Sequence, residues 1–138
     1  MTKFSLRILE ADGVFFDDYV VSLVVPTTEG SFGIQAKHEN MIAAVVPGTI
    51  KYTLPDGDEI YAAITGGFMK VEDNEVLILA EAAELPEDID EKRMAREIEE
   101  VKEELLQKQS IEEYKIAQAR MARAINRLKV KHKYGRKG

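Results

Sequence analysis

The chain has 138 residues, of which 45% are hydrophobic and 32% charged, and its formal net charge is −6. These values suit one globular domain, or a small domain with an appendage, and exclude a disordered or fibrous chain. Because the chain has no cysteine, disulfides, thiolate catalysis and cysteine-based zinc sites are excluded.

Metal binding and membrane insertion are not expected from the sequence. The two histidines, His38 and His132, lie far apart, and no group of acidic residues has the spacing of a metal site. The N-terminus has no apolar run of signal-peptide length, and no segment approaches the ~18 apolar residues of a membrane span. We therefore expect a soluble, intracellular protein.

The charges are distributed unevenly along the chain. Residues 1–86 carry 5 basic and 14 acidic groups, and residues 87–113 carry 5 basic and 11 acidic groups. Residues 114–138 carry 9 basic groups and no acidic one. A segment of this kind favours either an acidic neighbour within the protein or an anionic partner.

Residues 1–86 are predicted to form short strands. The segment 3–10 alternates between apolar and polar residues, and residues 19–27 form a β-branched apolar run that ends at Pro26. The apolar side of the first segment consists of Phe4, Leu6 and Ile8. Short strands of this spacing predict an antiparallel sandwich or barrel.

Residues 41–84 supply several further strands, separated by turn sequences. The turns are Pro47-Gly48, Pro55-Asp56-Gly57-Asp58 and Asp73-Asn74. The second turn lies between two strand-like segments and predicts a hairpin over residues 53–64. Gly66-Gly67 lies within a strand-like segment, so it predicts a bulge or a close approach of two backbones.

The apolar period changes to that of a helix after Leu85-Pro86. Asp88 is predicted to cap the first helix, with Glu91 completing a capping pair. The apolar residues then recur at intervals of three and four, as one face of a helix requires. They are Met94, Ile98, Val101 and Leu105.

A second helix is predicted after a turn at residues 107–110. Ser110 is positioned to cap it, with Glu113 three residues later, and the tail at residues 129–138 is expected to fray. Its apolar stripe comprises Tyr114, Ala117, Met121, Ala124 and Leu128, with Ile111 and Ile125 beside it. Both stripes are narrow, as in a helical hairpin or coiled coil.

The two predicted helices carry opposite charges and can lie antiparallel. Exposed ion pairs contribute only about 0–1 kcal/mol each, so such a hairpin is held weakly without another surface. The sequence thus predicts a movable appendage next to the strand-rich domain.

Three segments in this order resemble the epsilon subunit of bacterial F-type ATP synthase. They are EGSFGIQAKHENMIAAVVPGTIKY, ITGGFMKVEDNEVLILAEAAE and the helical segment with AQARMARAINRLKV. The resemblance runs over essentially the whole chain. It implies a β sandwich of about ten antiparallel strands at residues 1–86, followed by an α-helical hairpin at residues 87–138.

The resemblance also implies a non-catalytic rotor subunit in the central stalk of a proton-translocating enzyme. The sandwich would dock on the gamma subunit and the c ring, and the extended hairpin would enter the head of alpha and beta subunits and inhibit ATP hydrolysis. The location implied is the cytoplasmic face of the bacterial membrane, as a peripheral subunit.

Two contact surfaces follow from the resemblance. The inhibitory helix would meet an acidic loop of the catalytic beta subunit through Lys115, Arg120, Arg123 and Arg127. The loop that would contact the c ring contains Glu29, Gly30, Ser31 and His38. Without the resemblance, the basic row reads as a solvated face and His38 as a structural residue.

A regulatory ATP site is implied at the folded hairpin by the pattern Ile89-Asp90-Glu91-Lys92-Arg93. Asp90 would contact the adenine, and Arg93, Arg123 and Arg127 the phosphates, with Glu84 and Ile89 on the base side. Two residues depart from the family pattern, Met94 in place of alanine and Glu100 in place of arginine. The magnesium requirement stays open. Alternatively, Asp90 is simply a favourable acid at a helix start.

A nucleic-acid-binding module is the alternative function, because residues 120–137 are rich in lysine and arginine. The acidic residues 1–113 and the lack of interleaved aromatic residues oppose it. No nucleophile and base, no pair of catalytic acids and no phosphate-binding glycine loop indicate an enzyme.

Overall fold

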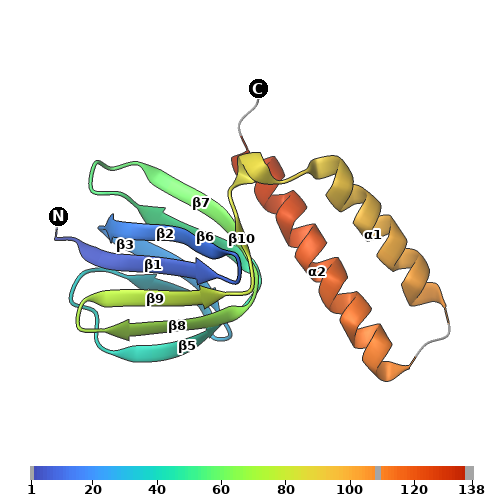
Figure 1. Ribbon diagram of the computed structural model, residues 1–138, viewed down its shortest axis with the longest axis horizontal. Helices are drawn as coiled ribbons and strands as arrows, with labels where there is room; N and C mark the ends of the chain where they lie inside the picture. The colour runs from blue at the N-terminus through green and yellow to red at the C-terminus, as the bar shows by residue number, and fades with distance from the viewer. Residues whose placement is uncertain (1, 108–109, 136–138) are drawn as a thin grey trace. The chain divides into compact units, whose positions relative to one another are not determined.

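The computed structural model describes residues 2–107 and 110–135 and divides the chain into two compact units, Met1–Glu84 and Leu85–Gly138 (Figure 1). The first unit is built of strands and the second of helices. The division falls just before the boundary expected at Pro86.

Ten strands form the first unit in the part of the chain that the structure describes. They are β1 (Phe4–Glu10), β2 (Gly13–Val20), β3 (Ser22–Thr27), β4 (Gly30–Ile34), β5 (Met41–Val45), β6 (Gly48–Thr53), β7 (Glu59–Ile64), β8 (Gly67–Glu72), β9 (Glu75–Ala80) and β10 (Ala83–Glu84). The run predicted at residues 19–27 is divided between the end of β2 and β3.

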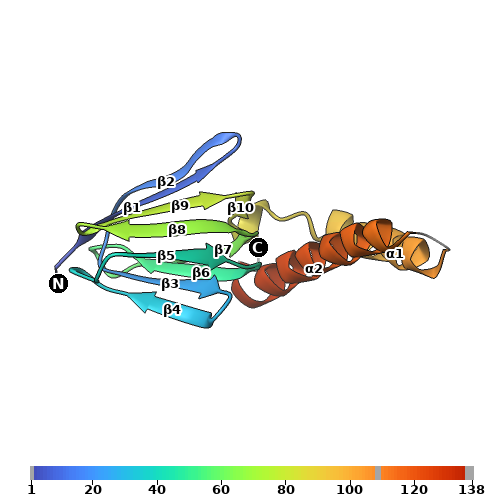
Figure 2. The ribbon, with the colours of Figure 1, turned by 90° about the horizontal axis from the view of Figure 1, so that it is seen from below.

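The strands form two layers, seen edge-on in Figure 2. The hydrogen-bonded order is β10-β7-β6-β3-β5-β8-β9-β1-β2, with β4 on β3. Only the pair Thr27–Val45 joins β3 to β5, so the sheet is divided there into the two halves of a sandwich. The predicted fold class is confirmed, although β1 and β9 run parallel rather than antiparallel.

The core lies between the two layers and follows the period of two residues. Phe4, Leu6 and Ile8 are buried, as predicted, whereas Arg7 of the same strand is exposed. Leu23 and Ile50 of the opposite layer are also fully buried. Complete burial of each such side chain contributes about 1.5–3 kcal/mol, so this alternation is the main source of the sandwich's stability.

The predicted hairpin and the Gly-Gly approach are both present. β6 and β7 are joined by a turn in which the Leu54 amide donates to the Asp58 carbonyl at 2.8 Å. In this turn Gly57 has a φ of +98°, which favours glycine. Gly67 opens β8, where its backbone lies against Leu79 and Ala80 of β9.

The second unit contains a short 3₁₀ turn, η1 (Pro86–Asp88), followed by α1 (Glu91–Leu106) and α2 (Ile111–Tyr134). The predicted cap at Asp88 is wrong, because Asp88 belongs to the 3₁₀ turn. Ile89 and Asp90 then have extended backbones, so α1 begins later. Asp90 caps the helix instead, since its Oδ1 accepts from the Arg93 amide at 3.0 Å.

The predicted fraying of the tail is wrong over residues 129–134, which continue α2. Val130 is only 1% exposed, and α2 packs against η1. Lys131, His132 and Lys133 lie in the last turn, where positive charge suits the helix dipole. Gly135 follows as the C-cap of α2, and residues 136–138 of the predicted tail lie outside the described residues.

The predicted capping box at the start of α2 is confirmed. The Glu113 amide donates to Ser110 Oγ at 3.1 Å, and the Ser110 amide donates to Glu113 Oε1 at 3.4 Å. Lys108 and Gln109 of the predicted turn lie outside the described residues. Both apolar stripes are partly buried, most completely at Met94, Val101, Ala117 and Ala124.

We expect Ser110→Ala to destabilise the first turn of α2 by about 1 kcal/mol, because it removes the Oγ that accepts from the Glu113 amide. Hydrogen exchange at the amides of residues 113 and 114 would measure the loss. Ser31→Ala, at an exposed serine of β4, is the matched control and should leave these amides unchanged. Equal protection in both variants would contradict the role of the cap.

Candidate functional site

α1 and α2 lie side by side as an antiparallel hairpin (Figure 1). Several side-chain contacts connect the two helices. Among the described residues they include Glu91 with His132, Met94 with Arg127, and Glu104 with Arg120. The partner's number falls as the number in α1 rises, so these contacts fix the antiparallel register.

Arg120 is held by two carboxylates of α1. Its Nη1 donates to both carboxylate oxygens of Glu104, at 3.0 and 2.9 Å, and its Nε lies 3.7 Å from Glu97 Oε1. The hydrogen bond to Glu104 raises the pKa of Arg120. Because the Arg120 side chain is 32% exposed, each pair contributes no more than about 1 kcal/mol. The pairs thus set the register more than the stability.

The other two cross-links lie nearer the start of α1. His132 Nε2 lies 2.6 Å from Glu91 Oε1, and Arg127 Nη1 donates to Met94 Sδ at 3.9 Å. The sulfur is a weak acceptor, so this second contact holds Arg127 loosely. Met94 therefore contacts one of the arginines expected to bind phosphate.

A shallow pocket of about 320 Å³ opens on one side of the hairpin. Its lining residues are Arg93, Arg96, Glu97, Glu100 and Arg120. We call this the hairpin pocket. Three arginines from two helices line this one space. Guanidinium groups bind phosphate oxygens through two parallel hydrogen bonds.

The structure brings together only part of the predicted nucleotide site. Arg93 lines the hairpin pocket, but Arg123 and Arg127 are not among its lining residues. The Asp90 carboxylate caps α1, and Ile89 is buried. Glu84 lies in β10, opposite Ala63 of β7, in the other unit.

Arg96 and Arg120 line this pocket but were not predicted to belong to the nucleotide site. Arg96 could have been found, because residues three apart on a helix are neighbours and Arg96 follows Arg93 at that spacing. Arg120 was predicted to contact the catalytic beta subunit. In the folded hairpin its side chain is hydrogen-bonded to Glu104. The other residues of that predicted contact lie on α2, with Lys115 exposed and Arg123 and Arg127 half-buried.

The predicted c-ring residues lie around β4. Glu29 is in the turn between β3 and β4, where its amide donates to Thr27 Oγ1 at 3.2 Å. Gly30, which opens β4, has a φ of +105°, and Ser31 after it is exposed. His38 follows the strand, with Nδ1 2.8 Å from the Glu39 carbonyl oxygen and its ring in a T-shaped arrangement with that of Phe32.

The outer face of the β5-β8-β9-β1-β2 layer carries an apolar row that the sequence analysis did not identify. Cross-strand pairing places one residue from each strand in register, and we call this set the outer row. It consists of Ala44, Phe68, Leu79, Leu9 and Val14. Phe68 is the most prominent at 63% exposed. Contiguous exposed apolar residues mark interaction surfaces.

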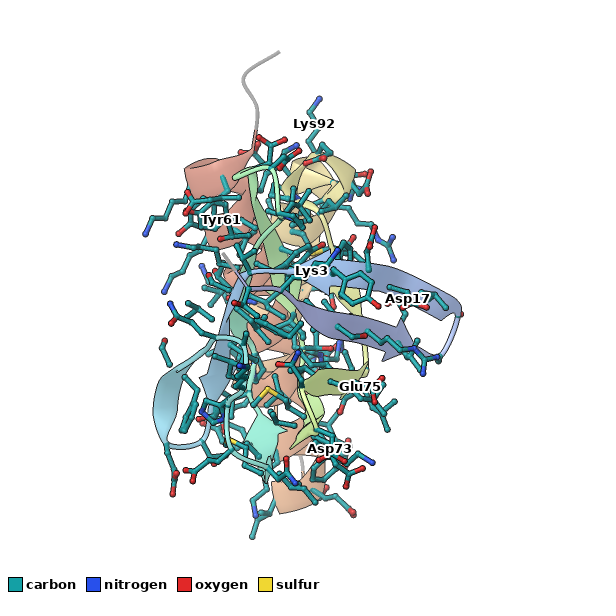
Figure 3. All side chains as sticks on the ribbon, turned by 90° about the vertical axis from the view of Figure 1, so that its left-hand side faces the viewer. Lys3, Asp17, Tyr61, Asp73, Glu75 and Lys92 are labelled. Carbon is teal, nitrogen blue, oxygen red and sulfur yellow. The ribbon has the colours of Figure 1, made fainter. Side chains whose placement is uncertain are left out.

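The far end of the same face is polar. Asp17 and Glu75 project there, and Lys3 lies over the Tyr19 ring at 4.8 Å (Figure 3). Arg7 lies 3.7 Å from Asp17. The outer row is therefore bordered by charged side chains, as the apolar centre of a protein–protein interface is.

Among the described residues, no helix combines the length and the apolar character that a membrane span requires. Within the same ranges, no group of three or more histidine, aspartate or glutamate side chains is arranged to hold a metal ion.

Comparisons with known proteins agree with the fold and extend over nearly the whole chain. The family model for the ATP synthase delta/epsilon chain, beta-sandwich domain, matches residues 3–86. The ATP synthase epsilon chain of Caldicellulosiruptor bescii is 37% identical over 130 residues, 94% of either chain. That of Shouchella clausii is 37% identical over 134 residues, which cover 96% of this chain and 98% of the relative.

A solved structure supports the fold. A chain in the cryo-EM structure of the Euglena gracilis mitochondrial ATP synthase superposes with a TM-score of 0.79 at 23% identity, covering 91% of this chain and 79% of that one. The sandwich, the helical hairpin and the sequence matches together show that the chain belongs to the ATP synthase epsilon family.

Proposed function

We propose that this chain is the central-stalk rotor subunit of a proton-translocating ATP synthase and that its hairpin regulates ATP hydrolysis. As an epsilon chain it is a non-catalytic subunit of the complex. In the proposal, bound ATP keeps the hairpin folded, and the released hairpin inhibits hydrolysis. The nucleic-acid alternative is not retained, because the relatives reported above are epsilon chains.

The observation that carries the regulatory proposal is the hairpin pocket, which is lined by arginines of both helices. A polyanion bound by Arg93 of α1 and Arg120 of α2 connects the helices, so it binds the folded hairpin more tightly than separated helices. A ligand of this kind stabilises the folded state by about 2.7 kcal/mol at a hundredfold excess over its Kd.

The cross-links of the hairpin itself are weak enough for such a ligand to matter. The Arg120 pairs are partly exposed, and so is the pair of His132 with Glu91. Because exposed pairs contribute about 0–1 kcal/mol each, the binding energy of a nucleotide exceeds that of any one of them. A few kcal/mol suffice to change which of two states is populated.

The partners in this proposal follow from the two units. The outer row would dock on the gamma subunit, and the residues Glu29, Gly30, Ser31 and His38 would face the c ring. The released α2 would present Lys115, Arg120, Arg123 and Arg127 to an acidic surface of the catalytic beta subunit, next to the alpha subunits. The chain would then lie at the cytoplasmic face of the bacterial membrane as a peripheral subunit.

The nucleotide part is tested by titrating ATP into the isolated chain, with and without magnesium. Asp90→Asn keeps a capping side chain while altering the proposed base contact, and Arg93→Gln removes a phosphate contact. We expect each to weaken binding by about tenfold, the loss of a charge-assisted hydrogen bond, and the double variant to weaken it by about a hundredfold. Unchanged affinity in the double variant would place the ATP site elsewhere.

The inhibitory part is tested in the assembled complex. Removing residues 87–138 should raise ATP hydrolysis by several-fold, because the proposed inhibitory helix is then missing. A full-length variant in which Arg120, Arg123 and Arg127 are all replaced by glutamine should raise ATP hydrolysis by a similar factor if those charges make the inhibitory contact. Equal hydrolysis by the complete and shortened complexes would exclude the hairpin as an inhibitor.

A further inference from the structure

The hairpin pocket contains an arginine that the family pattern does not assign. Arg96 lies on α1, three residues after Arg93, and lines the same space as Arg93 and Arg120. Glu100, which stands where the family pattern has an arginine, also lines this space. In this pocket, Glu100 thus places a carboxylate where the family pattern has a positive charge, and Arg96 adds a positive charge where the pattern assigns no role.

The three arginines of the pocket, Arg93, Arg96 and Arg120, differ in the contacts that they already make within the hairpin. Arg120 is held by Glu104 and lies close to Glu97. Within residues 2–107 and 110–135, the side chains of Arg93 and Arg96 form no ion pair within 4.0 Å. Both remain available to an anion, whereas Arg120 would have to share its hydrogen bonds.

We propose that Arg96 is a phosphate-binding residue of the hairpin pocket and supplies the positive charge that Glu100 does not. This inference rests on the proposed binding of ATP by the folded hairpin. Neighbouring guanidinium groups at a spacing of three residues can contact different oxygens of one polyphosphate. Glu100 opposes the same anion and lowers its affinity.

The test compares single-residue variants of the full chain by calorimetric titration with ATP. Arg96→Gln should weaken binding about five- to tenfold, since it removes a charge-assisted contact. Lys92→Gln is the matched control, because it removes one positive charge from an exposed position on α1 outside the pocket (Figure 3). It should change the affinity by less than about twofold. Glu100→Gln should strengthen binding by about two- to fivefold.

The outcomes separate this inference from the proposed function. If Arg93→Gln weakens binding but Arg96→Gln behaves like Lys92→Gln, the role of Arg96 is wrong and the ATP site stands. If the unaltered chain binds neither ATP nor inorganic tripolyphosphate, both are wrong. Circular dichroism of each variant should show unchanged helix content, because Arg96 is exposed and forms no cross-link in the hairpin.

Discussion

Gly67→Ala is expected to destabilise the sandwich by about 3 kcal/mol, a large part of the stability of a small domain. A Cβ atom at this position would lie 2.0 Å from the Leu79 carbonyl oxygen and 3.0 Å from Ala80 Cα. Both atoms belong to the backbone of β9, so no side-chain rotation relieves the clash. The pair Gly67–Ala80 would have to separate, weakening the ladder between β8 and β9.

Urea unfolding of the full chain, followed by far-ultraviolet circular dichroism, measures this loss. Gly33→Ala is the matched control, since Gly33 also lies in a strand and a Cβ atom there meets nothing within 4 Å. Its effect should stay within about 0.5 kcal/mol. Similar losses for the two variants would show that glycine flexibility, and not the close approach of β8 to β9, determines the effect.

The strands that could be predicted are those with one buried face. In β1 the alternation of Phe4, Leu6 and Ile8 with polar residues follows directly from burial on one side. The β6–β7 hairpin was predictable because its turn contains Gly57 at a positive φ. The close approach at Gly67 had a local signal too, a pair of glycines within an apolar strand.

The elements that were missed lack such a local signal. β2 is an edge strand whose residues are mostly exposed, and a register shift opposite Ile8 and Leu9 interrupts its alternation. The parallel pairing of β1 with β9 joins residues 5–9 to residues 75–79, near the two ends of the first unit. No local sequence pattern indicates a pairing between such distant segments. The outer row depends on this pairing and was therefore not predictable strand by strand.

The candidate site was predicted in part for a similar reason. The family pattern led to Arg93, which does line the hairpin pocket. The register of the two helices decides which arginines of α2 line the pocket. Narrow apolar stripes with small alanines do not fix that register from the sequence. The contact of Arg120 with Glu104 sets it, and a contact between residues sixteen apart on two helices leaves no local pattern in the sequence.

If the outer row docks on the gamma subunit as proposed, Phe68→Asp should weaken that binding by roughly 30- to 1000-fold, the effect of losing an aromatic anchor. Phe68 lies within the outer row, between Ala44 of β5 and Leu79 of β9. Docking would bury its ring, whereas an aspartate there would lose its hydration without gaining a partner. Titration calorimetry with the purified gamma subunit measures the change.

Tyr19→Asp is the control that locates the interface on this face. Tyr19 is also an exposed aromatic residue, 50% exposed, but it lies at the polar end of the sheet, away from the outer row. Equal losses for the two variants would mean that negative charge anywhere on the face disturbs docking, and no loss for Phe68→Asp would exclude the outer row. Because the hairpin pocket belongs to the other unit, Phe68→Asp should bind ATP as the unaltered chain does. Loss of gamma binding with ATP binding retained would assign docking and regulation to separate parts of the chain.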